Sequence, residues 1–504
     1  MDQGILPLTA TATAQDVLPA LDDFPLSPFV TYEAWSQSTF DLTSGVIRPD
    51  QGAVGFPATD PNLDPLLAPR LAVGSPMSGL GDAYTDLPPN PITEEPATTM
   101  LPSVARFPYF VEKVEFPFIS TFDGENWARI KRYMVMLSAR SPVIASAISA
   151  VEALYEAEEL GQETSNAISL YYAAKADHAK MLRFQEPDLE FTFIVMALLA
   201  CFEVVSQQDT VPTMMKSEGP FVIKLERWIQ QRPWPPVVCR IETWLKLLHV
   251  KALHLGGRGF MSAKVSHLFS YNAATLTPSL IFLDRDPPPT SILYDGLASP
   301  LFEFYIQTQQ IGASICGLNR HHRSRGTLAD ESEVDQTALK IRQQLALLRQ
   351  QAPSLLRLNR DQLQALVPES LLDELSTLID LCNAAYQIEI VDLGRAHGQW
   401  LTPTPEAQEA LRQVRRIVDD NVARNHAAVN PGFMWPIFFY ALEADQEGGN
   451  WAVQMLQRVQ KPIYQSDFMA RFLAAVVELQ GQRSDRVDCR YLCTEKFGIA
   501  PPFI

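Results

Sequence analysis

The segment 240–255 repeats apolar side chains at the spacing of one face of an α-helix. Those apolar positions are Ile241, Trp244, Leu245, Leu248, Ala252 and Leu255. Such spacing predicts an amphipathic helix that buries one face in a larger helical body, with Trp244 and Leu248 buried together. The other side carries Arg240, Glu242, Lys246 and Lys251, and Gly256 and Gly257 follow where a left-handed residue ends a helix.

Helical spacing recurs along the chain from residue 106 onward. Ser141-Pro142 and Thr404-Pro405 each combine a helix N-cap with proline at the first helical position. Apolar residues at 334–348 and 371–385 step by four and three, which predicts bundle helices with one narrow apolar stripe each. Further helices are expected at 127–137, 168–181, 189–205, 222–229, 435–440 and 466–479. Strand signals are few, chiefly 107–122 and 281–283, and the predicted class is all-α.

The bulk composition narrows the class of protein. The chain has 504 residues, 47% of them apolar, and a formal net charge of −17. This acidic balance argues against sequence-independent binding to nucleic acid or to an anionic membrane, because both depend on clustered Lys and Arg. The longest apolar run, 191–202, is shorter than a membrane span and is expected to be a buried helix. No secretory signal pattern opens the chain, and six scattered cysteines are expected to be buried free thiols.

Residues 1–104 differ from the rest. They contain 15 prolines and 13 acidic residues, against only Arg48 and Arg70 and no lysine, which gives a net charge of −11. Such a segment is expected to be a disordered acidic, proline-rich arm. Phe24, Phe29 and Trp35 stand among acidic residues that keep aromatic side chains in solvent, as in transcriptional activation segments; a featureless acidic tail is the alternative.

Several motifs in the remaining residues occur in a familiar order. A Ser-Pro helix start at 141–142 is followed by Tyr171-Tyr172, by an apolar helix ending in Phe202-Glu203, by the segment from Trp244 through Gly257 to Leu268, and by Trp435-Pro436 with Trp451. This order resembles the helical regulatory domain of fungal zinc-cluster (Zn2Cys6) transcription factors. The resemblance implies that residues 105–504 form a large multi-helix regulatory domain.

The chain lacks the two Cys-x-x-Cys pairs and two further cysteines whose six thiolates together hold the two zinc ions of that family's DNA-binding module. The closest pair, Cys489 and Cys493, lies one helical turn apart without further ligands nearby. His249 and His254 lie five residues apart, off the spacing that places two ligands on one helix face, and are expected at the surface or its boundary. We therefore predict no metal-binding residues.

Three other motifs have simpler interpretations than chemistry. Residues 312–317 contain one residue too many for a serine-nucleophile elbow, so the small residues there are expected at a helix contact. Residues 256–259 are glycine-rich but end a helix, whereas phosphate loops begin one. Residues 320–325 form a compact basic cluster, for which a solvated loop before the helix starting near residue 330 is the favoured interpretation; a nuclear-import patch or a partner contact is the alternative. We predict no catalytic residues, no cofactor and no enzymatic activity.

The resemblance implies a nuclear transcriptional regulator that controls a pathway-specific gene set, such as a secondary-metabolite cluster. Without its own zinc cluster the chain is expected to act as a co-regulator, with the transcriptional machinery or a DNA-binding protein as partner, no tight DNA binding of its own and no membrane contact. A homodimer stays open. The alternatives are an all-α enzyme or small-molecule-binding protein, which a pocket with converging, perturbed titratable groups would favour, and a helical scaffold.

Overall fold

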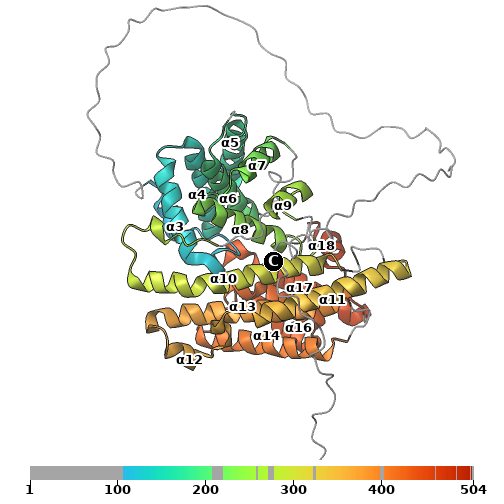
Figure 1. Cartoon of the computed structure of the whole chain (residues 1–504). Coiled ribbons are helices and arrows are strands. Elements are labelled where there is room, and N and C mark those ends of the chain that lie inside the picture. The colour runs from blue at the N-terminus through green and yellow to red at the C-terminus, as the bar shows by residue number, and fades with distance from the viewer. Residues whose placement is uncertain are drawn as a thin grey trace, which may run out of the picture.

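The computed structural model describes residues 106–501, apart from 185, 207–218, 257–258, 271–276, 320, 322–324, 398–401, 460, 484 and 500. These residues form seventeen α-helices and no strand (Figure 1), so the predicted all-α class is confirmed. The acidic arm predicted at 1–104 lies outside the described residues.

The two predicted strand signals were wrong. Residues 107–122 contain α2 (Pro108–Lys113), a turn and the start of α3 (Ser120–Ser138), and residues 281–283 form a 3-10 turn, η3 (Ile281–Leu283). Phe110, Val114 and Phe116 are all fully buried. The many apolar residues between 107 and 122 are therefore explained by burial of this segment on several sides. A short apolar run does not by itself distinguish a strand from other buried structure.

Helices α3 to α9 gather in the upper part of the molecule in Figure 1. After α3 they are α4 (Pro142–Leu160), α5 (Ser165–Met181), α6 (Leu189–Ser206), α7 (Pro220–Gln230), α8 (Pro236–Lys251) and α9 (Ala263–Ser270). Ser141 caps α4 as predicted, since its hydroxyl accepts a hydrogen bond from the Ile144 amide at 3.4 Å. Helix α6 is long and apolar enough to cross a membrane by length and composition, but 78% of it is buried inside the protein, as expected for a core helix.

The long helices that follow residue 288 lie side by side beneath this group (Figure 1). They are α10 (Pro289–Cys316), α11 (Leu328–Gln350), α13 (Glu369–His397) and α14 (Pro405–Arg424), accompanied by the shorter α12 (Arg360–Gln364), α15 (Met434–Glu443), α16 (Gln446–Gln457), α17 (Ser466–Arg483) and α18 (Cys489–Phe497). Thr404 caps α14 as predicted, accepting from the Ala407 amide at 3.2 Å. Helix α13 packs against both α10 and α14.

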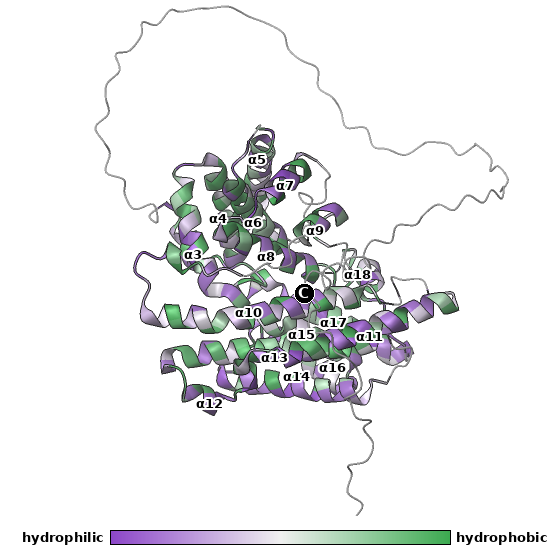
Figure 2. Ribbon diagram, viewed as in Figure 1, coloured by the Kyte–Doolittle hydropathy of each residue, from purple (hydrophilic) through white to green (hydrophobic). Residues whose placement is uncertain are grey.

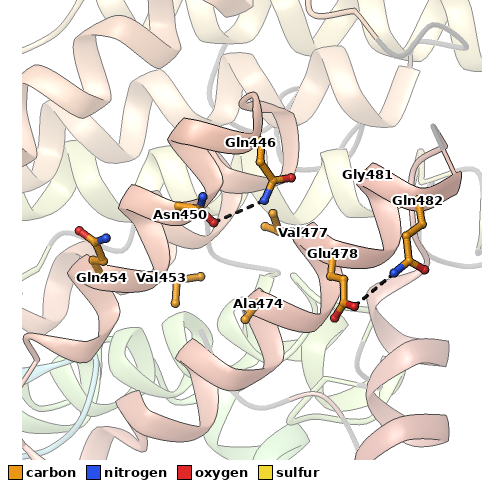
Figure 3. Close-up of a pocket in the computed structure, with 9 residues that line it drawn as sticks. All are labelled: Gln446, Asn450, Val453, Gln454, Ala474, Val477, Glu478, Gly481 and Gln482. Atoms are coloured by element: carbon orange, nitrogen blue, oxygen red, sulfur yellow. Dashed lines mark hydrogen bonds between the residues drawn. The ribbon is translucent and has the colours of Figure 1, made fainter.

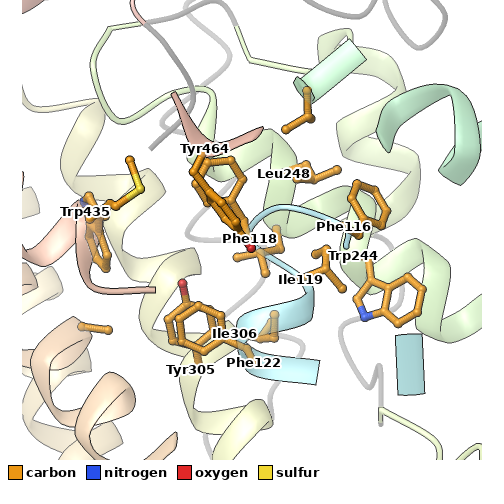
Figure 4. Packing of buried hydrophobic residues seen from close by; sticks show 14 of the residues in the cluster. Phe116, Phe118, Ile119, Phe122, Trp244, Leu248, Tyr305, Ile306, Trp435 and Tyr464 are labelled. Carbon is orange, nitrogen blue, oxygen red and sulfur yellow. The ribbon is translucent and has the colours of Figure 1, made fainter. Parts of the chain in front are cut away.

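One continuous apolar core joins the two groups of helices, because its buried side chains come from all seventeen of them. Figure 2 shows hydrophilic residues along the outer side of α14, while α6 is mostly hydrophobic. Figure 4 shows part of this core, where Trp244 and Leu248 of α8 pack beside Phe116 and Ile119. Trp244 and Leu248 are both fully buried, as predicted.

The polar side of α8 departs from the prediction of a helix with one buried face. Arg240, Glu242 and Lys251 are each at most 2% exposed. The reason is that α8 has neighbours on more than one side, with α6 on one and α10 on another. The helix also ends at Lys251, earlier than predicted, and Gly256 adopts the left-handed conformation (φ 79°) five residues later.

Helix α13 differs from prediction for the same reason. Its predicted narrow stripe (residues 371–385) is buried, but burial extends to polar positions such as Glu389 and Asp392. The neighbours of α13 include α10, α11, α14 and α15, so the helix is enclosed on several sides. By contrast, α11 has the predicted single stripe, which includes Val334, Ile341 and Leu348.

Candidate functional site

Six polar or aromatic side chains meet in the interior where α8, α10, α13 and α15 approach each other. We call this group the central polar cluster: Lys251, His254, Tyr305, Gln309, Glu389 and Trp435. Lys251 is the last residue of α8, and His254 lies in the turn that follows. None of the six is more than 5% exposed.

Aromatic rings surround the Lys251 ammonium. Its Nζ lies 4.1 Å from the centre of the Trp435 ring and 5.6 Å from that of Tyr305. A cation over an aromatic face is stabilised by about 2 kcal/mol when both groups are removed from water. Tyr305 is itself held by Phe122, against which it stacks at a centroid distance of 3.6 Å (Figure 4).

His254 connects α8 to α15 and α10. Its ring stacks on Trp435 at a centroid distance of 4.8 Å, and its Nδ1 lies 3.6 Å from the Cys316 sulfur. Gln309 lies near the imidazole and raises its pKa, against the larger lowering by burial, although its amide atoms do not meet hydrogen-bond geometry with the ring. The predicted position of His254 at the surface or its boundary was therefore wrong.

Glu389 lies against a glycine of α10. A Cβ atom placed on Gly312 would come within 2.2 Å of Glu389 Oε1, so only glycine leaves room for this carboxyl group. Tyr305, Gln309, Gly312 and Cys316 recur at helical spacing, which directs them to the same side of α10. The predicted role of residue 312 as a small residue at a helix contact is confirmed.

Most polar atoms of the cluster lack a protein partner. Seven buried atoms have no hydrogen-bond partner among the described residues: His254 Nε2, Tyr305 Oη, Gln309 Nε2 and Oε1, Glu389 Oε1 and Oε2, and Trp435 Nε1. Each such group costs about 1–3 kcal/mol, whereas a whole domain is stable by only about 5–15 kcal/mol. Groups of this kind in native proteins call for an explanation, such as a bound water or ligand.

Burial also shifts the pKa values of the titratable groups in the cluster. It lowers the pKa of Lys251 to about 7, an effect that the nearby Glu389 opposes. The pKa of Glu389 is raised well above its usual range, mainly by burial and further by Asp392, and the pKa of His254 is lowered well below its own. The arrangement can therefore hold a guest by hydrogen bonds, and it contains acids and bases whose charged forms are disfavoured.

Two other buried polar networks are, by contrast, well paired. Asp123 accepts hydrogen bonds from Arg240 Nε at 2.6 Å and from Trp244 Nε1 at 2.8 Å, which links α3 to α8. Glu443 accepts from Arg395 at 2.7 Å and from Arg486 at 2.6 Å, which links α13, α15 and the segment before α18. These networks use their polar atoms within the protein, as structural ion pairs do.

The surface has a groove of about 650 Å³ between α16 and α17 (Figure 3). Val453, Ala474 and Val477 line it, and its amide side chains bond within their own helices, as Gln446 does with Asn450 at 3.4 Å and Gln482 with Glu478 at 3.2 Å. A hollow of about 510 Å³ lies between α3 and the start of α13, where Lys461 pairs with Glu115. In this hollow Ser120 Oγ accepts from the Phe116 amide at 2.7 Å, and Lys131 donates to the Val111 and Val114 carbonyls at 2.6 and 2.8 Å.

The other residues singled out by sequence have structural surroundings. His249 Nδ1 accepts from the backbone amides of Phe260 and Met261 at 2.8 and 3.0 Å. Cys489 and Cys493 are buried free thiols on α18, and the described residues contain no group of three His, Cys, Asp or Glu side chains arranged to hold a metal. Of the basic cluster 320–325, the described Arg325 donates to backbone carbonyls near the ends of α10 and α13.

Sequence reasoning missed the central polar cluster. One available signal was Glu389 between Ile388 and Ile390, an acid inside an apolar run of a long helix. The fold and this site define an all-α protein with one continuous core and an internal polar cluster. No family model, no curated protein and no solved structure matches the chain.

Proposed function

We propose that this chain is a nuclear transcriptional regulator of the fungal zinc-cluster family that acts through its helical regulatory domain. It would control a pathway-specific gene set, such as a secondary-metabolite cluster. It would act as a co-regulator recruited by a DNA-binding partner, because its sequence contains no zinc-cluster spacing and its net charge is −17.

One contact carries the proposal. Two of the motifs behind the resemblance, Tyr171-Tyr172 on α5 and Phe202-Glu203 on α6, pack together. The Tyr171 hydroxyl donates to the Glu203 carboxylate, and the Tyr171 and Phe202 rings stack at 4.5 Å with planes 13° apart. These two motifs lie about thirty positions apart in the sequence and form one packing unit in the structure. Their contact supports the regulatory-domain interpretation.

A reporter assay tests this proposal. The full chain, fused to an unrelated DNA-binding module, should change transcription from a promoter with that module's site, and a fluorescently tagged chain should accumulate in the nucleus of a fungal host. If the fusion is expressed but leaves the reporter unchanged, and the tagged chain is excluded from the nucleus, the proposed role as a transcriptional regulator is rejected.

The co-regulator role needs a separate experiment. Purified full chain should contain no stoichiometric zinc and cause no specific mobility shift on promoter fragments at physiological salt. A zinc-dependent, sequence-specific shift would show that the chain binds DNA itself.

The small-molecule-binding alternative also has a specific observation in its favour, namely the converging, perturbed titratable groups of the central polar cluster. A tagged chain that stays in the cytoplasm and retains a bound small molecule through purification would support that class of function over transcriptional regulation.

A further inference from the structure

We propose that the central polar cluster is an internal binding site for a small, uncharged guest that both donates and accepts hydrogen bonds. Water molecules and a small hydroxylated or amide compound share this chemistry. The inference does not depend on the transcriptional role.

The first argument is the hydrogen-bond inventory. Trp435 Nε1 is purely a donor, Tyr305 Oη both donates and accepts, and the Gln309 amide offers a donor and an acceptor. None of these atoms has a partner among the described residues, and each of the three side chains is at most 2% exposed. A guest that bonds to them needs complementary groups of both kinds.

Charge indicates that the guest is neutral. The cluster contains one base that can be cationic, Lys251, and one acid, Glu389, so its own charges can balance. A charged guest would leave a net charge buried among apolar rings, which is strongly unfavourable. His254 does not supply a second cation, because its charged form is disfavoured by burial and by Lys251.

Packing indicates that the guest is small. Glu389 fills the space above Gly312 so closely that an added Cβ would meet its Oε1 at 2.2 Å. On other sides the cluster is closed by Phe122, stacked on Tyr305, and by Phe439, whose ring centre is 6.0 Å from that of His254. A site bounded in this way suits a few water molecules or a compound of comparable size.

Tyr305→Phe distinguishes an occupied site from an unpaired hydroxyl, because this substitution removes only the oxygen atom. If Oη bonds to a guest, the variant loses that bond and its unfolding equilibrium constant should rise roughly two- to tenfold in urea titrations. If Oη is unpaired, its removal relieves a desolvation cost and the constant should fall.

Tyr386→Phe provides the calibration. The Tyr386 hydroxyl, on α13, donates to the Leu345 carbonyl at 3.2 Å, so its removal reports the cost of losing a known bond of a buried tyrosine. A destabilisation by Tyr305→Phe comparable to that of Tyr386→Phe supports the guest. A stabilisation overturns it.

Direct observation completes the test and identifies the source of the guest. A high-resolution crystal structure of the full chain should show non-protein density within hydrogen-bond distance of Tyr305 and Gln309. Native mass spectrometry of the purified chain then separates the two cases, since a defined added mass indicates a retained compound and its absence indicates water. Protein atoms filling this space, with no density between them, would refute the proposal.

Discussion

Gly312→Ala is the most informative single substitution in the interior, because the structure specifies which atoms it would displace. An alanine Cβ would lie 2.2 Å from Glu389 Oε1 and 2.9 Å from the rest of the carboxyl group. Contacts of that length do not occur, so the carboxyl group must move by about 1 Å or the α10–α13 contact must widen. Since Glu389 is fully buried, its movement displaces other atoms of the core.

Two opposing effects determine the magnitude. Replacing a helical glycine by alanine stabilises by roughly 0.5–1 kcal/mol through helix propensity. Overpacking a well-filled core costs typically about 1–3 kcal/mol. The matched control is Gly296→Ala on the same helix. Apart from its chain neighbours and its own helix backbone, nothing lies within 4 Å of the added Cβ, so this variant reports propensity alone. The difference between the two variants isolates the packing cost, expected at about 1–3 kcal/mol.

Urea unfolding of the two variants and the wild type, followed by circular dichroism, measures this difference. Glu389→Ala in the Gly312→Ala background should remove the penalty, and the resulting coupling energy attributes it to this pair. If Gly312→Ala stabilises the protein as much as Gly296→Ala does, the carboxyl group does not occupy the position described, and the geometry of the cluster needs revision.

Three further predictions address other parts of the chain. Leu248→Asp places an unpaired charge in the core and should cost about 4 kcal/mol or more, giving insoluble protein; a soluble variant with an unchanged melting temperature would contradict the central place of α8. Replacing Phe24, Phe29 and Trp35 by Ala should weaken reporter activation by the fused chain, and unchanged activation would reduce the arm to a spacer. Burial raises the pKa of Asp392 to about 7, so the stability linked to its protonation is fully present below about pH 4 and is lost as the pH rises through 7. The stability of Asp392→Asn relative to wild type should accordingly grow between about pH 4 and 7 and stay constant above; a pH-independent difference would show that Asp392 ionises normally.

Helix positions and caps were predictable from sequence because they depend on local chemistry. Ser141 and Thr404 accept hydrogen bonds from amides three residues ahead, and that interaction needs no tertiary partner. The apolar stripe of α11 was predictable because the helix packs on one side only. A sequence pattern shows which residues avoid water, and for a helix that packs on one side this information is enough to predict the buried face.

The central polar cluster was not predictable because its members are brought together by packing. Lys251 and Tyr305 are 54 residues apart, and Glu389 is a further 84 residues along the chain. Periodicity correctly predicts that Lys251 points away from the apolar stripe of its helix. Whether that side meets water depends on α10 and α15, and no property of residues 240–255 reports their position.

Helix α8 connects the two groups of helices through its charged residues as well as its apolar ones. Near its start Arg240 pairs with Asp123 of α3 in its own group, and the same guanidinium lies 5.0 Å from the centre of the Phe302 ring of α10. At its end the Lys251 ammonium lies over Trp435 of α15. Breaking a buried pair by removing one partner typically costs about 3–5 kcal/mol, whereas apolar replacement of the whole pair is often neutral. We therefore expect the charges of α8 to contribute more to how the two groups dock than to stability. A change in the charge of Lys251, whose pKa is about 7, would act at this junction and not at the surface.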